Sequence, residues 1–71
     1  MSKEMRIKQV LRVRGLSQSR LARWADVPES AMSRILRGKE PPYPKRGQRI
    51  ADALGWSGPW EELFEEVEVT V

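Results

Sequence analysis

Residues 18–37 of the chain read QSRLARWADVPESAMSRILR and have the pattern of two short helices joined by a tight turn. In both halves, apolar or small side chains recur every three or four residues, the spacing that places them on one face of a helix. The other positions are largely polar or basic. The pattern predicts two helices packed across one another, with the polar face of the second helix left exposed.

The first of these helices is expected over residues 18–25, with Ser17 as its cap, because a serine hydroxyl can accept a bond from a free N–H of the first turn. Ala22 lies within the apolar face, where a small side chain allows another helix to cross closely. Asp26 follows at the turn. Glycine would fit a left-handed turn position most easily, but a short polar side chain is tolerated there.

The second helix is expected to begin with Pro28, whose missing N–H would be unpaired at a first helical position, and to end at Gly38. Its apolar positions predict a buried face made of Met32, Ile35 and Leu36. The opposite side is small, polar and basic, and it consists of Glu29, Ser30, Ser33, Arg34 and Arg37.

The segment before this pair predicts another helix, capped by Ser2 and ending at about Arg14. Gly15 comes directly after the last apolar repeat, which is typical of a left-handed cap at the C-terminus of a helix. After Gly38 the chain changes character, because three prolines within residues 39–44 predict an extended connection.

Two further helices are expected after this connection. One begins at Pro44 or the next residue and ends at Gly55, and the other spans about residues 59–66. The tail VEVTV alternates like a strand, but five residues cannot form a sheet alone. We therefore expect an all-α, compact five-helix domain over residues 1–66 and a short tail over residues 67–71.

Charge is unevenly distributed along the chain. Residues 1–49 contain all 13 Lys and Arg and only four acidic residues, a net charge of +9, whereas residues 50–71 contain six acidic residues and no basic one, a net charge of −6. The first part therefore favours a polyanionic partner and the second part disfavours one. The simpler interpretation is that these charges only keep a small domain in solution.

Several classes of protein are disfavoured by the composition. The chain has no cysteine and no histidine, which excludes a disulfide framework and the usual zinc sites. No spacing suggests a nucleophile with its base, so we expect no enzyme, no cofactor and no small-molecule substrate. No run approaches 18 apolar residues, and the start, MSKEMRIK, lacks the apolar segment of a signal peptide. We expect a soluble cytoplasmic protein without a membrane partner.

Two motifs, GLSQSRLA at residues 15–22 and VPESAMSRILRG at residues 27–38, resemble the lambda-repressor-like, Cro-type helix-turn-helix family of phage and bacterial transcriptional regulators. The resemblance is looser over residues 49–64, where RIADALGW and ELF look like the family's closing helices. It implies that the third helix enters the major groove of double-stranded DNA while the second crosses the backbone. Two positions depart from the family pattern, since Asp26 stands where glycine is usual and Pro28 where serine is usual.

Carried over residue by residue, the resemblance implies that the base-reading side chains are Glu29, Ser30, Ser33 and Arg34. Arg34 is the best single candidate, because its guanidinium matches guanine O6 and N7. The alternative is that Arg34 is a solvated surface residue. The resemblance also places Gln18 against the phosphate backbone, and the basic residues expected to join it are Arg20, Arg23, Arg37, Lys39, Lys45 and Arg46.

Glu29 has two interpretations of equal weight. As a base reader it would accept a hydrogen bond from a cytosine or adenine amino group. As a structural residue it would stabilise the positive end of the helix dipole and pair with Gln18 or Arg20.

The leading hypothesis is a sequence-specific transcriptional regulator, most simply a repressor of a prophage or other mobile element, binding DNA as a homodimer. A dimer would use the fifth helix and the tail, and the residues available for it are Trp60, Phe64, Val67, Val69 and Val71. The runner-up is a protein-interaction module on the same fold that does not read DNA. A third hypothesis is an architectural protein that binds DNA without sequence preference.

Overall fold

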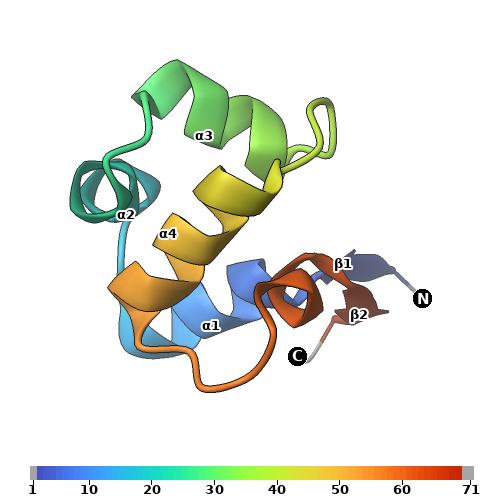
Figure 1. The fold of residues 1–71 in the computed structure, drawn as a ribbon. Coiled ribbons are helices and arrows are strands. Elements are labelled where there is room, and N and C mark those ends of the chain that lie inside the picture. The colour runs from blue at the N-terminus through green and yellow to red at the C-terminus, as the bar shows by residue number, and fades with distance from the viewer. Residues whose placement is uncertain (1, 70–71) are drawn as a thin grey trace.

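The computed structural model describes residues 2–69, which form four α-helices, one 3-10 helix and one two-stranded sheet (Figure 1). In chain order the elements are β1 (Lys3–Met5), α1 (Arg6–Arg14), α2 (Gln18–Ala25), α3 (Glu29–Leu36), α4 (Pro44–Leu54), η1 (Trp60–Phe64) and β2 (Glu66–Glu68). The mainly helical fold agrees with the expected all-α class. The expected count of five α-helices is wrong.

The helix ends form largely as the local sequence predicts. Gly15 and Gly55 follow α1 and α4 with φ of 63° and 66°, in the left-handed region. Asp26 adopts φ of 56° between α2 and α3, and it is the one non-glycine residue with positive φ among residues 2–69. The Ser17 side chain accepts a hydrogen bond from the Arg20 N–H at 3.1 Å and so caps α2. Together these residues set the lengths of α1, α2 and α4 and the turn between α2 and α3.

Helix α3 begins one residue later than expected, at Glu29 instead of Pro28. Pro28 is the cap rather than the first helical residue, and its carbonyl accepts the first bond of the helix from the Met32 N–H at 2.9 Å. Because proline has no N–H and a backbone already close to the cap conformation, it costs α3 little at this place.

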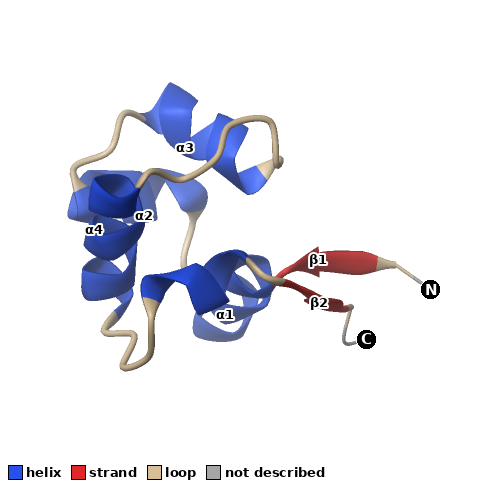
Figure 2. Cartoon of the chain, turned by 45° about the vertical axis from the view of Figure 1, so that its right-hand side comes forward, coloured by secondary structure: helices blue, strands red, loops and turns tan. Residues whose placement is uncertain are grey.

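The N-terminal helix begins later than expected, because Ser2 does not cap it. Residues Lys3–Met5 form β1, which pairs antiparallel with β2, Lys3 lying opposite Glu68 and Met5 opposite Glu66. The tail therefore finds its partner strand within the same chain, and the two strands lie side by side where both ends of the chain emerge (Figure 2). Of the expected tail, Val71 lies outside the described residues.

The last helical segment, η1, is a 3-10 helix of five residues instead of an α-helix. Pro59 precedes it and has no N–H, and Glu65 ends it with an extended backbone, φ of −73° and ψ of 143°. Glu65 leads directly into β2, and its carbonyl accepts a bond from the Arg6 N–H at 2.9 Å. Because a proline precedes the segment and a strand follows it, the segment stays short, and 3-10 geometry is usual in such short helical pieces.

The core receives at least one fully buried side chain from each helix. The largest of these are Ile7, Leu21, Met32, Ile35, Ile50 and Leu63. Helix α2 contacts both α3 and α4, and Ala22, which is 3% exposed, keeps these contacts close. In Figure 1, α2 is seen nearly along its axis and α3 lies across it. The expected buried faces of α2 and α3 are confirmed, and within residues 2–69 no helix is long and apolar enough to cross a membrane.

Candidate nucleic-acid interface

The outer face of α3 is open to solvent. Ala31, Met32, Ile35 and Leu36 are buried, whereas Glu29, Ser30, Arg34 and Arg37 are exposed and Ser33 is half-buried. Positions 29, 30, 33, 34 and 37 share one side of a helix because they are spaced by one, three or four residues. The four candidate base-reading residues are therefore together on a face that is largely open to solvent.

Glu29 is held from α2 by a residue that the sequence did not indicate. The Ser19 hydroxyl donates to Oε1 of Glu29 at 2.6 Å, which joins the first turn of α2 to the first turn of α3. The partner is therefore Ser19 rather than Gln18 or Arg20, the two residues expected from sequence. Glu29 also lies at the N-terminus of α3, where the helix dipole favours a negative charge.

The candidate phosphate contacts fall into three groups. Gln18, Arg20 and Arg23 belong to α2, Arg37 and Lys39 follow α3 directly, and Lys45 and Arg46 are in the first turn of α4. All are exposed except Gln18 and Arg46, which are half-buried. Glu40 lies within 3.7 Å of both Arg34 of α3 and Arg46 of α4, so the third group lies close to the last turn of α3.

The two α2 arginines differ in direction. Arg23 is four residues after Ser19 and therefore shares the side of α2 that meets the start of α3. Arg20 is one residue after Ser19 and is rotated away from that side by about 100°. Arg23 is thus the arginine of α2 that lies nearer the exposed face of α3.

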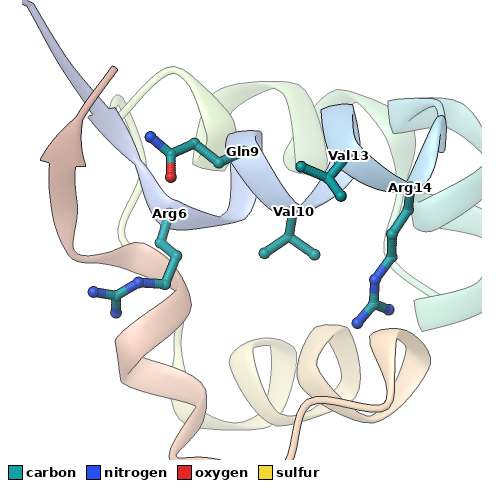
Figure 3. A pocket seen from close by; sticks show the side chains of 5 residues that line it. All are labelled: Arg6, Gln9, Val10, Val13 and Arg14. Carbon is teal, nitrogen blue, oxygen red and sulfur yellow. The ribbon is translucent and has the colours of Figure 1, made fainter. Parts of the chain in front are cut away.

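Two arginines of α1 serve the fold. Arg6 Nη1 donates to the Glu62 carbonyl at 2.9 Å and also pairs with Glu65 at 3.2 Å, and Arg14 donates to the Leu54 carbonyl. Figure 3 shows both side chains directed from α1 toward the C-terminal half of the molecule. They line an open groove of about 370 Å³ together with Gln9, Val10 and Val13. These contacts place part of the basic charge of the N-terminal half away from the interface.

Glu40 belongs to the candidate interface although the sequence did not indicate it. It lies in the connection between α3 and α4, and its Oε2 is 3.7 Å from Nε of Arg34 and 3.6 Å from Nη1 of Arg46. One signal in the sequence is that Glu40 is the single acidic residue between Glu29 and Asp52. Arg46 sits at the positive end of α4, so Glu40 also offsets the unfavourable placement of a cation there.

The residues expected at a dimer interface are partly engaged within the chain. The rings of Trp60 and Phe64 meet edge to face with centroids 6.0 Å apart, and both pack against the core. Val67 lies opposite Glu4 in the sheet, and Val67 and Val69 are half-buried. Each of the four therefore keeps only part of its surface for another molecule, while Val71 lies outside the described residues.

Comparison with families of known proteins agrees with this geometry. The model of a helix-turn-helix domain family matches residues 4–64, a range that contains α1 to α4 and η1. Domains of this kind bind DNA through the second helix of the motif, the position that α3 occupies here. No curated protein and no solved structure matches the chain. Because the family model covers most of the residues, the chain belongs to the helix-turn-helix domain family.

Proposed function

We propose that this protein is a sequence-specific regulator of transcription, of the lambda-repressor-like, Cro type, that binds double-stranded DNA with α3 in the major groove. The observation that carries the proposal is the division of α3 into two faces, one buried by Met32 and Ile35 and one exposed, polar and basic. Such a helix is held rigidly by its scaffold, and its free side fits a groove about 12 Å wide. The protein acts as a binding module and not as an enzyme.

Base reading belongs to the exposed face. Arg34 donates two hydrogen bonds to guanine O6 and N7, a contact worth about 1–3 kcal/mol of discrimination. Ser30 and Ser33 are short, so they let the helix backbone approach the base edges closely. Glu29, already bonded to Ser19 through Oε1, retains Oε2 to accept a bond from a cytosine amino group. The same carboxylate repels phosphates and so discourages misplaced binding.

Affinity comes from the groups around α3. Gln18 and the N-terminus of α2 contact one phosphate strand, and the contacts that fix the register on the backbone come from Arg20, Arg23, Arg37, Lys39, Lys45 and Arg46. If about five of these neutralise phosphates, log affinity falls with log salt at a slope of about −4 to −5.

The regulator acts as a repressor by occupying promoter DNA, in a prophage or other mobile element. Two copies bind half-sites about 34–36 Å apart, as is usual for this class of motif. The exposed parts of Trp60, Phe64, Val67 and Val69 supply the contact between the copies, with Val71 as a further candidate. Changing Val69 to lysine is expected to abolish cooperative binding to two half-sites while leaving binding to one half-site unchanged.

Selection of bound sequences from a random duplex library tests the proposal. The expected result is a palindrome with about 10 base pairs between half-site centres. Arg34→Ala is then expected to lose preference at one base position, whereas Arg37→Ala weakens binding to all sequences alike. Salt-dependent binding without any motif would support an architectural protein instead. Absence of salt-dependent binding would support the protein-interaction module.

A further inference from the structure

The carboxylate of Glu40 is shared between the exposed face of α3 and the start of α4. Its Oε2 contacts Nε of Arg34 at 3.7 Å and Nη1 of Arg46 at 3.6 Å. The side chain of Glu40 is 25% exposed, whereas that of Arg34 is 53% exposed. The partly buried carboxylate of Glu40 therefore contacts the inner part of the Arg34 guanidinium, whereas more than half of the Arg34 side chain is exposed to solvent.

The atom of Arg34 that faces Glu40 decides which donors remain available. A guanidinium has five N–H donors in a rigid plane, one on Nε and two on each terminal nitrogen. Because Nε is the atom nearest Glu40 and the side chain is 53% exposed, the edge formed by Nη1 and Nη2 remains available to another molecule. This edge has the geometry for a paired contact with O6 and N7 of guanine.

Oε2 of Glu40 can form shorter bonds to Arg34 and Arg46 than the contacts in this structure. It is buried, and within the described residues it accepts no hydrogen bond, since both arginine nitrogens lie beyond 3.5 Å. A buried carboxylate oxygen without a bond is costly. A small rotation of either guanidinium would shorten the contact to the 2.7–2.9 Å typical of charged pairs. DNA that orders Arg34 would thus also satisfy Glu40.

Arg46 makes the arrangement stiffer. It holds Glu40 from α4, a different element from the helix that carries Arg34. The position of the carboxylate is therefore set by arginines from two helices and not by the connection alone. An anion at this place also repels phosphate, which disfavours orientations in which Arg34 would turn to the DNA backbone.

We infer that Glu40 is a positioning residue for base recognition, which aims the Nη1 and Nη2 edge of Arg34 at a guanine and keeps Arg34 from serving as a general phosphate contact. The inference rests on the proposed function, because it assigns a second residue to the same base contact. It attributes specificity to a residue that itself touches no base.

Binding to matched duplexes tests this assignment. One duplex carries the selected site, a second replaces the base pair at which Arg34→Ala loses preference, and a third has random sequence. Glu40→Gln keeps the size of the side chain and removes its charge. We expect Glu40→Gln to lower discrimination between the first two duplexes about 3- to 10-fold, part of the full value of a paired arginine contact. Affinity for random duplex is expected to rise about two- to fivefold.

Three comparisons make the result specific. Glu66→Gln removes one negative charge from β2, away from α3 in Figure 1, and is expected to leave discrimination unchanged. Glu40→Asp keeps the charge and is expected to retain more discrimination than Glu40→Gln. In a chain that already carries Arg34→Ala, Glu40→Gln is expected to have no effect on discrimination.

Two outcomes would overturn the inference while the proposed function stands. Equal strengthening on all three duplexes would make Glu40 a mere repulsive charge. Equal loss of affinity for all three duplexes would mean that Glu40 only stabilises the fold. A lowered thermal midpoint of Glu40→Gln would show this independently. Failure of the unaltered protein to select any motif is the distinct result that removes the proposed function, and the inference with it.

Discussion

Gly47 of α4 lies directly beneath the indole of Trp60, so α4 has no room there for a side chain. A Cβ added at Gly47 would be 2.6 Å from Cδ2 and 2.7 Å from Cζ3 of Trp60. Replacing glycine by alanine within a helix normally stabilises a protein by about 0.5–1 kcal/mol. At this position we expect the opposite, because the added methyl group forces the ring away from the core.

Gly47→Ala is therefore expected to lower the free energy of unfolding by about 1–3 kcal/mol, the usual cost of overpacking. Urea unfolding followed by tryptophan fluorescence measures this loss. Gln48→Ala, at the exposed neighbouring position, is the control and should change stability by less than about 0.5 kcal/mol. Stabilisation by Gly47→Ala would show that the indole moves aside at little cost.

Asp26→Gly is expected to stabilise the protein. Asp26 holds the turn of the helix-turn-helix with φ of 56°, a conformation that strains side chains and not glycine. The expected gain is about 0.5–1 kcal/mol, because an aspartate tolerates this region better than most residues. For a chain of this size it raises the thermal midpoint by about 2–8 °C. The same substitution at Asp52, inside α4, should instead destabilise, by about 0.3 kcal/mol of helix propensity and by loss of the hydrogen bond that its carboxylate accepts from Gln48.

Ser19 and Glu29 are expected to be energetically coupled. Their 2.6 Å hydrogen bond joins α2 to α3 and is exposed, so we expect a coupling free energy of about 0.5–1 kcal/mol. Thermal unfolding of Ser19→Ala, Glu29→Ala and the double variant measures it. A matched pair of Ser57→Ala and Glu29→Ala should be additive, since Ser57 lies in the connection between α4 and η1. Additivity at Ser19 as well would mean that the bond does not persist in solution.

Features set by neighbouring residues could be predicted from the sequence, whereas those set by distant partners could not. The caps at Ser17, Gly15 and Asp26 depend on one or two hydrogen bonds to residues nearby in the chain. The buried faces of α2 and α3 follow from helical spacing alone. Strand β1 has only three residues, and what makes Lys3 part of a strand is Glu68 at the other end of the chain.

The candidate site divides in the same way. Its exposed face could be predicted, because the buried side of α3 is apolar and the rest must face outward. Glu40 could not, since its role depends on Arg34 and Arg46 being brought to it from two different helices. The choice of Ser19 rather than Gln18 as the partner of Glu29 depends likewise on the angle between α2 and α3.

Lys45 and Arg46 are neighbours in the first turn of α4, yet substitution of each is expected to change DNA binding differently. Lys45 is exposed and opposes the helix dipole, which suits a phosphate contact. Lys45→Ala is expected to weaken binding to selected and random duplexes equally and to reduce the salt slope by about 1. Arg46 is half-buried and contacts Glu40 at 3.6 Å. Arg46→Ala releases that carboxylate and is expected to lower discrimination in addition to affinity.

Titration of both variants at several salt concentrations, on the selected and random duplexes, separates the two effects. Arg49→Ala, one turn further along α4, serves as the comparison for loss of a single positive charge from this helix. Identical behaviour of Lys45→Ala and Arg46→Ala would contradict the separate roles, because it would mean that Glu40 stays in place without Arg46. A loss of discrimination confined to Arg46→Ala would show that a charge on α4 acts on a base contact made from α3.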